Sequence, residues 1–146
     1  MPIIMISLRH VGLIVNDIEN SLLIYRDVLE FIPKLDQIES GTFYEHLTGI
    51  QDGIARTCKC YAKDGSCIEL IEYQSHESEK RNKGLLTDGF NHIAINIDNL
   101  DKKYQQLKKI NVRFINEPKI NHQKTAKVAF CYDYENNLLE LVETLL

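Results

Sequence analysis

The chain has 146 residues, of which 44% are hydrophobic and 26% are charged, and its formal net charge is -4. This length supports one well-buried core and is too short for two ordinary domains. The acidic balance and the lack of a basic run in the sequence argue against nucleic acid as a partner.

The opening segment, residues 1–6, is apolar, but it is too short for a signal sequence and no basic segment precedes it. We therefore expect a cytoplasmic protein with no membrane partner. The cysteines lack the spacing of a zinc ribbon or of a secreted disulfide framework, so we expect them to be reduced. They are Cys58, Cys60, Cys67 and Cys131.

Residues 7–15 alternate in polarity, which predicts a half-buried strand with His10 on the face opposite the apolar side chains. Asp17 is suited to cap a following helix, and Pro33 ends any helical continuation. The first half of the chain is longer than the second, and the extra residues lie within about residues 36–55. A long insert of this kind is a candidate lid.

A hairpin is predicted at Asp64-Gly65, because Asp-Gly is a strong signal for a two-residue turn. Such a turn pairs Cys60 with Glu69 and places Arg56 on the same face of the sheet. The corresponding turn at Glu135-Asn136 places Cys131 opposite Glu140 by the same reasoning.

The polar segment 75–88 is predicted to be a surface linker between the two halves. After it, residues 91–97 match the first predicted strand, with His92 in the place of His10. Asp98 or Asn99 can cap the helix that follows, and Asn111 is suited to a left-handed C-terminal cap.

The second half therefore repeats the first, most clearly in residues 60–72 and 131–143. Each copy supplies one histidine and one glutamate, and together they form a mixed nitrogen and oxygen ligand set for a metal. A glutamate in an apolar strand is costly unless it is paired or coordinated. The four candidates are His10, Glu69, His92 and Glu140. Glu72 and Glu143 face the other side of their strands, and we expect them to be solvated.

Five short motifs, in their order and spacing, resemble the vicinal oxygen chelate superfamily, to which glyoxalase I, methylmalonyl-CoA epimerase, fosfomycin-resistance proteins and extradiol dioxygenases belong. They are Arg9-His10-Val11-Gly12-Leu13-Ile14-Val15-Asn16-Asp17-Ile18, Tyr25-Arg26-Asp27-Val28-Leu29, Ile68-Glu69-Leu70, Asn91-His92-Ile93-Ala94 and Leu139-Glu140-Leu141-Val142-Glu143.

The resemblance implies an α+β fold in which one domain, 1–146, consists of two tandem βαβββ modules, at about 5–74 and 89–146. The modules would form a cup-shaped mixed sheet around a divalent metal. The matching ligand positions are His10, Glu69, His92 and Glu140. One departure is that Glu30 and Asn111 stand where a glycine often ends each helix.

The implied cofactor is one divalent ion of Ni, Co, Mn, Fe or Zn, with two positions left for a small-molecule substrate that has adjacent oxygens. Glu140 or Glu69 would then move a proton through an enediolate. We expect a metal-dependent enzyme similar to lactoylglutathione lyase, a lyase or isomerase. The alternatives are an epimerase of the methylmalonyl-CoA type and a non-catalytic protein that binds a small molecule such as an antibiotic. A homodimer is expected, and the metal site lies either within one chain or across the dimer.

Four further residues are candidates for contact with the substrate. Arg56 is suited to hold an anionic group. Glu45, beside His46 in the insert, is a candidate acid or base. Cys60 and Cys131 are expected to line the cup, where cysteines more often pack than react.

Overall fold

The computed structural model describes residues 5–81 and 83–146, so the prediction for the opening segment lies partly outside the described residues. The chain divides into two compact units. Unit 1 is Met1–Glu19 with Glu30–Ser78, and unit 2 is Asn20–Leu29 with Glu79–Leu146. The described residues have an α+β fold with two mixed sheets, as expected. None of their helices is long and apolar enough to cross a membrane.

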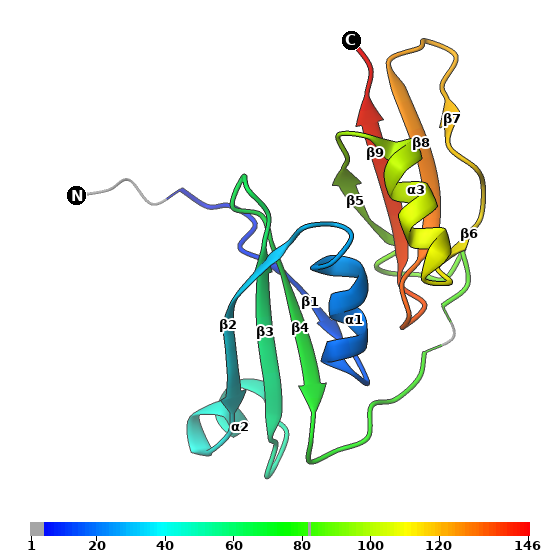
Figure 1. Cartoon of the computed structure of the whole chain (residues 1–146). Coiled ribbons are helices and arrows are strands. Elements are labelled where there is room, and N and C mark those ends of the chain that lie inside the picture. The colour runs from blue at the N-terminus through cyan, green and yellow to red at the C-terminus, as the bar shows by residue number, and fades with distance from the viewer. Residues whose placement is uncertain (1–4, 82) are drawn as a thin grey trace. The chain divides into compact units, whose positions relative to one another are not determined.

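Unit 1 contains a four-stranded sheet of order β1-β4-β3-β2 (Figure 1). The first strand is parallel to its neighbour, and the other pairs are antiparallel. The strands are β1 (Val11–Ile14), β2 (Ile32–Glu39), β3 (Ala55–Tyr61) and β4 (Cys67–Tyr73), and a short helix, α2 (Thr42–Thr48), follows β2. Helix α2 lies within the insert at about residues 36–55, where the sequence pattern predicted no helix.

One face of this sheet is buried and the other is partly open. The buried face carries small and apolar side chains, among them Cys58, Cys60, Ile68 and Leu70. Alternation along each strand sends their neighbours, such as Glu69, to the other face. The open face is therefore the one that carries the candidate ligands.

Helix α1 (Ile18–Tyr25) begins in unit 1, and most of it belongs to unit 2. Glu30 follows it with φ 63, the left-handed conformation that glycine adopts more easily. Asn111, which follows the helix Leu100–Lys109, has φ 64. The left-handed conformation predicted for Asn111 is confirmed, and Glu30 has the same conformation at a position where the family that the sequence resembles often has glycine.

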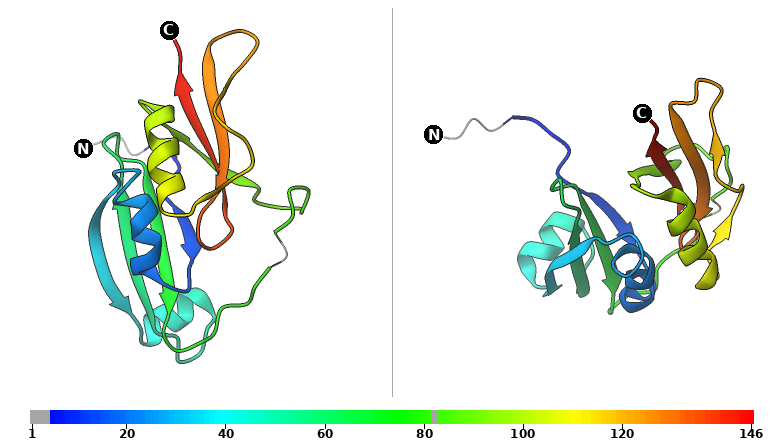
Figure 2. Two further views of the ribbon diagram at one scale, coloured as in Figure 1. Left: turned by 45° about the vertical axis from the view of Figure 1, so that its right-hand side comes forward. Right: turned by 45° about the horizontal axis from the view of Figure 1, so that its top comes forward.

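Unit 2 contains a sheet of order β5-β9-β8-β6, with β7 also paired to β8. Helix α3 (Leu100–Lys109) packs on β8 and β9, as Figure 2 shows. The predicted cap is confirmed, because the Asn99 side chain accepts a hydrogen bond from the backbone N–H of Lys102. The strands are β5 (His92–Asn96), β6 (Arg113–Phe114), β7 (Lys119–Ile120), β8 (Ala126–Tyr132) and β9 (Leu138–Thr144).

Residues 20–29 come from the first copy of the repeat, yet they pack within unit 2. The Tyr25 hydroxyl donates a 2.6 Å hydrogen bond to Asp133 Oδ2, and the two residues are 0% and 5% exposed. Asp133 Oδ1 also accepts from the backbone N–H groups of Glu135 and Asn137. One buried carboxylate thus joins α1 to the turn between β8 and β9.

The hairpin between β3 and β4 differs from the prediction by one residue. The N–H of Gly65 donates to the Ala62 carbonyl, and the N–H of Ala62 donates to the Ser66 carbonyl. With Gly65 at φ 90, this is a three-residue loop with a bulge rather than a two-residue turn. Lys59 therefore lies opposite Glu69, and the predicted pairing of Cys60 with Glu69 is wrong.

The second hairpin has the same turn. Asn136 takes the place of the glycine with φ 61, and its N–H donates to the Asp133 carbonyl. As a result Phe130 lies opposite Glu140, while Cys131 pairs with Leu139. The predicted pairing of Cys131 with Glu140 is wrong for the same reason.

Glu72 and Glu143 face the predicted side of their strands, but the expectation that they are only solvated is wrong. Glu72 Oε2 accepts a 2.8 Å hydrogen bond from the N–H of Ile18, at the start of α1. Glu143 Oε2 accepts a 3.1 Å bond from the N–H of Leu100, at the start of α3. Each carboxylate satisfies a backbone donor that a helix N-terminus otherwise leaves unpaired.

Candidate metal centre

In unit 1, His10 and Glu69 lie on the open face of the sheet. The parallel register pairs Gly12 with Glu69, so His10, two residues earlier, projects to the same side. His10 Nε2 is 3.9 Å from Glu69 Oε1, and their side chains are 30% and 15% exposed. The pair is therefore accessible to a small ion.

In unit 2, His92 and Glu140 form the matching pair, at 3.2 Å between Nε2 and Oε2. His92 Nδ1 lies 2.6 Å from Asn91 Oδ1, which can only accept a hydrogen bond, so Nδ1 carries a proton. In a neutral His92 the Nε2 lone pair then faces a carboxylate oxygen. That arrangement is repulsive unless a cation lies between the two atoms, whereas a ring protonated on both nitrogens forms an ion pair with Glu140.

The spacing in unit 2 also fits two ligands of one metal. Bonds of about 2.1 Å to nitrogen and to oxygen, at a right angle, put the two ligand atoms about 3 Å apart. The observed 3.2 Å between His92 Nε2 and Glu140 Oε2 agrees with this value. The corresponding 3.9 Å in unit 1 is longer. The donor set in unit 2 therefore fits a divalent ion.

The glutamates differ in their cross-strand neighbours, and the sequence analysis missed both neighbours. Lys59 Nζ lies 3.6 Å from Glu69 Oε2. Phe130 is opposite Glu140, and its ring meets the His92 ring edge-on at 5.4 Å between centroids. Both were missed because the hairpin turn was assigned two residues. A three-residue loop with Gly65 or Asn136 in the left-handed position gives the correct register.

Arg56 lies on the opposite face from Glu69, because it pairs directly with Glu72. Its Nε and Nη2 donate to the two oxygens of Asp36, and Nη2 also donates to Glu19. These acids raise the pKa of Arg56, and the guanidinium in turn lowers the pKa of Asp36. The reason for expecting a substrate contact at Arg56 is therefore removed.

Cys60 and Cys131 are buried and lie on the faces opposite to Glu69 and Glu140. Burial raises the pKa of each thiol to about 12. All four cysteines of the chain are free in the structure. Cys60 and Cys131 thus pack in the core, and the prediction that they line the cup is wrong.

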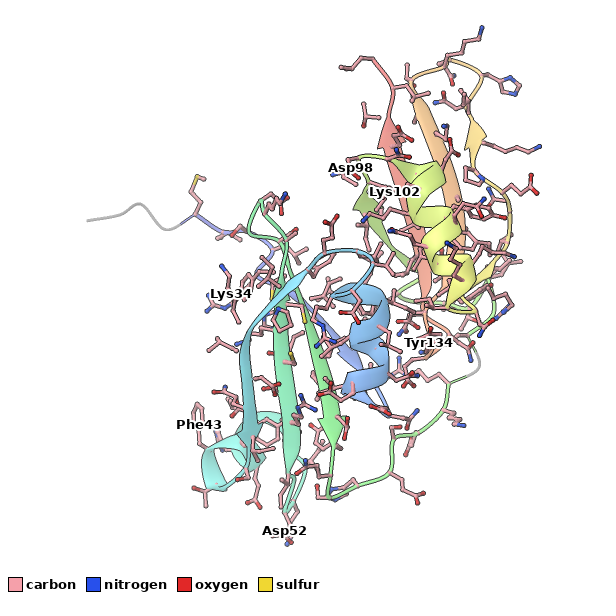
Figure 3. The ribbon with its side chains drawn as sticks, viewed as in Figure 1. Lys34, Phe43, Asp52, Asp98, Lys102 and Tyr134 are labelled. Atoms are coloured by element: carbon pink, nitrogen blue, oxygen red, sulfur yellow. The ribbon has the colours of Figure 1, made fainter. Side chains whose placement is uncertain are left out.

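The insert forms α2 and the loop after it. Glu45 Oε1 accepts a 2.7 Å hydrogen bond from the N–H of Asp52, which ties the helix to that loop, and His46 is exposed. The Tyr44 hydroxyl lies 3.0 Å from the hydroxyl of Tyr73, on the face that carries Glu69, and burial raises the pKa of Tyr44. Figure 3 shows Phe43 on α2 and Asp52 at the tip of the loop that follows.

Within the described residues, no group of three or more His, Cys, Asp or Glu side chains is gathered in a geometry that could hold a metal. Each unit instead contributes one His and Glu pair. Unit 1 thus contains the predicted pair His10 and Glu69, and unit 2 contains the predicted pair His92 and Glu140.

Solved structures show the same fold. A glyoxalase-family protein from Bacillus cereus is 16% identical, with a TM-score of 0.88 over 97% of this chain and 96% of that chain. The fosfomycin resistance protein FosX from Listeria monocytogenes is 19% identical, with a TM-score of 0.64 over 98% of this chain and 97% of that chain. Another structure of that protein, 17% identical and with a TM-score of 0.64 over 98% and 96% of the two chains, is a complex with Mn(II) and a sulfate ion.

No curated protein matches the chain. A family model, however, matches residues 7–141, which is nearly the whole sequence. That match spans both copies of the repeat and all four candidate ligands. The chain therefore belongs to the Glyoxalase/Bleomycin resistance protein/Dioxygenase superfamily.

Proposed function

We propose that this protein is a metal-dependent lyase or isomerase of the glyoxalase I type. Its single divalent ion is held by His10, Glu69, His92 and Glu140, which come from one chain or from the two chains of a homodimer. The substrate is a small molecule with adjacent oxygens. The observation that carries the proposal is the His92 and Glu140 pair, whose contact distance fits two ligands of one ion.

The FosX complex with Mn(II) supports the choice of a divalent ion, since it has the same fold. When bound, the ion supplies Lewis-acid stabilisation of negative charge that develops on a substrate oxygen. Two imidazoles and two carboxylates suit Ni, Co, Mn, Fe or Zn. The chain's own side chains supply the proton transfer.

Glu140 is the proposed base that takes a proton from the substrate carbon and returns it to the neighbouring carbon. Its carboxylate faces the Phe130 ring and His92, and the described residues place no Lys or Arg within ion-pair distance of it. The carboxylate of Glu69, by contrast, is partly neutralised by the Lys59 ammonium. An apolar neighbour leaves Glu140 better suited to exchange a proton during the reaction.

The first test is metal content and metal affinity. Protein purified without chelator should contain about one equivalent of metal, and Glu140→Gln should lower both the content and the affinity measured by calorimetry. Glu143→Gln is the matched control, because Glu143 lies on the same strand but on the other face. A wild-type protein that binds no metal after reconstitution would refute the proposal and favour a binding protein.

Lys59 provides a test of Glu69. If Glu69 is a ligand, Lys59→Met should raise metal affinity, because the ammonium no longer competes for the carboxylate. Lys59→Arg keeps the charge and serves as the control. Metal affinity that is unchanged in both Lys59→Met and Glu69→Gln would remove Glu69 from the ligand set.

Activity is then assayed on adducts of methylglyoxal with thiols. Conversion of the hemithioacetal to a thioester, lost in Glu140→Gln, is the expected result. A protein that does not form a thioester from the hemithioacetal, but inverts the configuration at the α-carbon of an acyl-CoA thioester, would instead be the epimerase alternative. The two outcomes differ in where the proton returns, so solvent deuterium incorporation distinguishes them.

A further inference from the structure

Unit 2 contains a cavity of about 390 Å³ that is lined by three cationic side chains. Arg81 and Lys83 come from the segment before β5, and Arg113 comes from β6. The other lining residues are Tyr132 and Asn136. Among the described residues that line this cavity, none carries a carboxylate. Three positive charges thus meet in a chain whose net charge is -4.

Two of these cations are held in place by neighbours. The Arg113 guanidinium stacks over the Tyr132 ring at 4.1 Å from its centroid, which leaves the edge of the guanidinium available to bind an anion. Lys83 Nζ donates to the Glu135 carbonyl at 3.1 Å and to Asn137 Oδ1 at 2.9 Å, two neutral acceptors that do not cancel its charge. The cavity is therefore positively charged and partly preorganised.

The cavity lies on the same face of the sheet as Glu140. Arg113 pairs directly with Tyr132, and Phe130, two residues before Tyr132, pairs with Glu140. Two residues along a strand span about 7 Å. A small molecule with its reacting end beside Glu140 can therefore reach the cavity with its other end.

We propose that this cavity binds a phosphate group of the substrate, which makes the substrate of the enzyme a phosphorylated compound with adjacent oxygens. The identification of the group as part of the substrate rests on the proposed function. The cavity is a separate anion site whose occupation needs no metal.

Phosphate fits this cavity better than a carboxylate does. Guanidinium groups bind phosphate oxygens in a bidentate manner, and a phosphate monoester carries up to two negative charges on three oxygens. A single carboxylate would leave two of the three cations at Arg81, Lys83 and Arg113 without compensation. Inorganic phosphate is therefore the suitable probe, with acetate as the comparison.

The experiment is a titration of the full-length protein with inorganic phosphate in the presence of EDTA, followed by amide and arginine side-chain NMR signals. Saturable shifts are expected at Arg113 and Tyr132. Arg113→Gln should weaken binding about tenfold or more. Arg26→Gln, which changes an arginine of unit 2 outside the cavity, should leave the affinity unchanged. Arg81→Gln is a second test variant, because the exposed Arg81 lies outside the strands and helices.

The proposal is overturned if phosphate causes no saturable shift at Arg113 and Tyr132, if both test variants bind it as the wild type does, or if acetate binds equally well. Failure of this site is distinguishable from failure of the metal site. Metal affinity is measured separately and should be unchanged in Arg113→Gln. Phosphate binding without metal binding would refute only the enzyme proposal, and metal binding without phosphate binding would refute only the phosphate site.

Discussion

The buried hydrogen bond between Tyr25 and Asp133 gives a quantitative test of how α1 is held in unit 2. Tyr25→Phe removes the hydroxyl and keeps the ring, so the change removes the 2.6 Å bond to a buried carboxylate. A hydrogen bond to a charged group contributes about 1.5–3 kcal/mol. Asp133 Oδ2 keeps a second donor, the side-chain amide of Asn137 at 2.9 Å, so the loss should be near the middle of that range, about 2 kcal/mol.

Urea denaturation followed by circular dichroism measures this loss as a lower midpoint at unchanged slope. For a chain of this size the melting temperature should fall by about 6–8 °C. Tyr104→Phe is the control, since the Tyr104 ring packs on Phe114 and its hydroxyl has no hydrogen bond partner in the described part of the chain. A Tyr25→Phe protein within about 0.5 kcal/mol of the wild type would refute the reasoning.

Two further predictions concern single positions. Glu30→Gly should raise the free energy of unfolding by about 0.5–1 kcal/mol, because glycine adopts the φ of 63 without steric strain. Glu30→Ala keeps the strain and should not stabilise the protein. Urea denaturation measures both variants, and equal stabilisation by alanine would contradict the prediction. Cys60 and Cys131 should resist alkylation in the native protein at about pH 8, because a pKa of about 12 leaves the thiols protonated. Mass spectrometry should find rapid labelling only in urea, and rapid labelling of the native protein would disprove it.

Much of the fold follows from the repeated pattern of the sequence. The alternation around His10 predicted a strand at residues 7–15, of which β1 covers only Val11–Ile14, and the matching segment 91–97 contains β5. The cap at Asn99 and the left-handed residue at Asn111 follow from local hydrogen bonding and backbone preference, which depend on few neighbours. Such local features are the ones that a single sequence reveals best.

The side chains around the candidate ligands were harder to predict, because they depend on the register of the hairpins. Reading Asp64-Gly65 as a two-residue turn shifted the pairing by one position. Since alternate residues face opposite sides, that shift exchanged Lys59 for Cys60 as the neighbour of Glu69. The same error hid Phe130 beside Glu140. The faces on which Glu69 and Glu140 lie follow from the alternation along their own strands, so the error in register did not affect that prediction.

Tertiary contacts account for the rest. The helix α2 has seven residues and none of them is buried, so its sequence carries no clear amphipathic pattern. The packing of residues 20–29 within unit 2 depends on Asp133, which is distant in the sequence. No local pattern reports a contact of that kind.

The spacing of the two glutamates on each last strand has a consequence for folding. Glu69 and Glu72 lie three residues apart on β4 and therefore face opposite sides of the sheet. Glu69 lies on the open face, and Glu72 accepts a hydrogen bond from the first N–H of α1. Glu140 and Glu143 do the same on β9. A hairpin that forms with its strands slipped by one residue would bury the first carboxylate without a partner and leave the helix start uncapped. A slip of one residue therefore raises the free energy of each hairpin in two separate ways. Both costs disfavour the misaligned pairing over the native one.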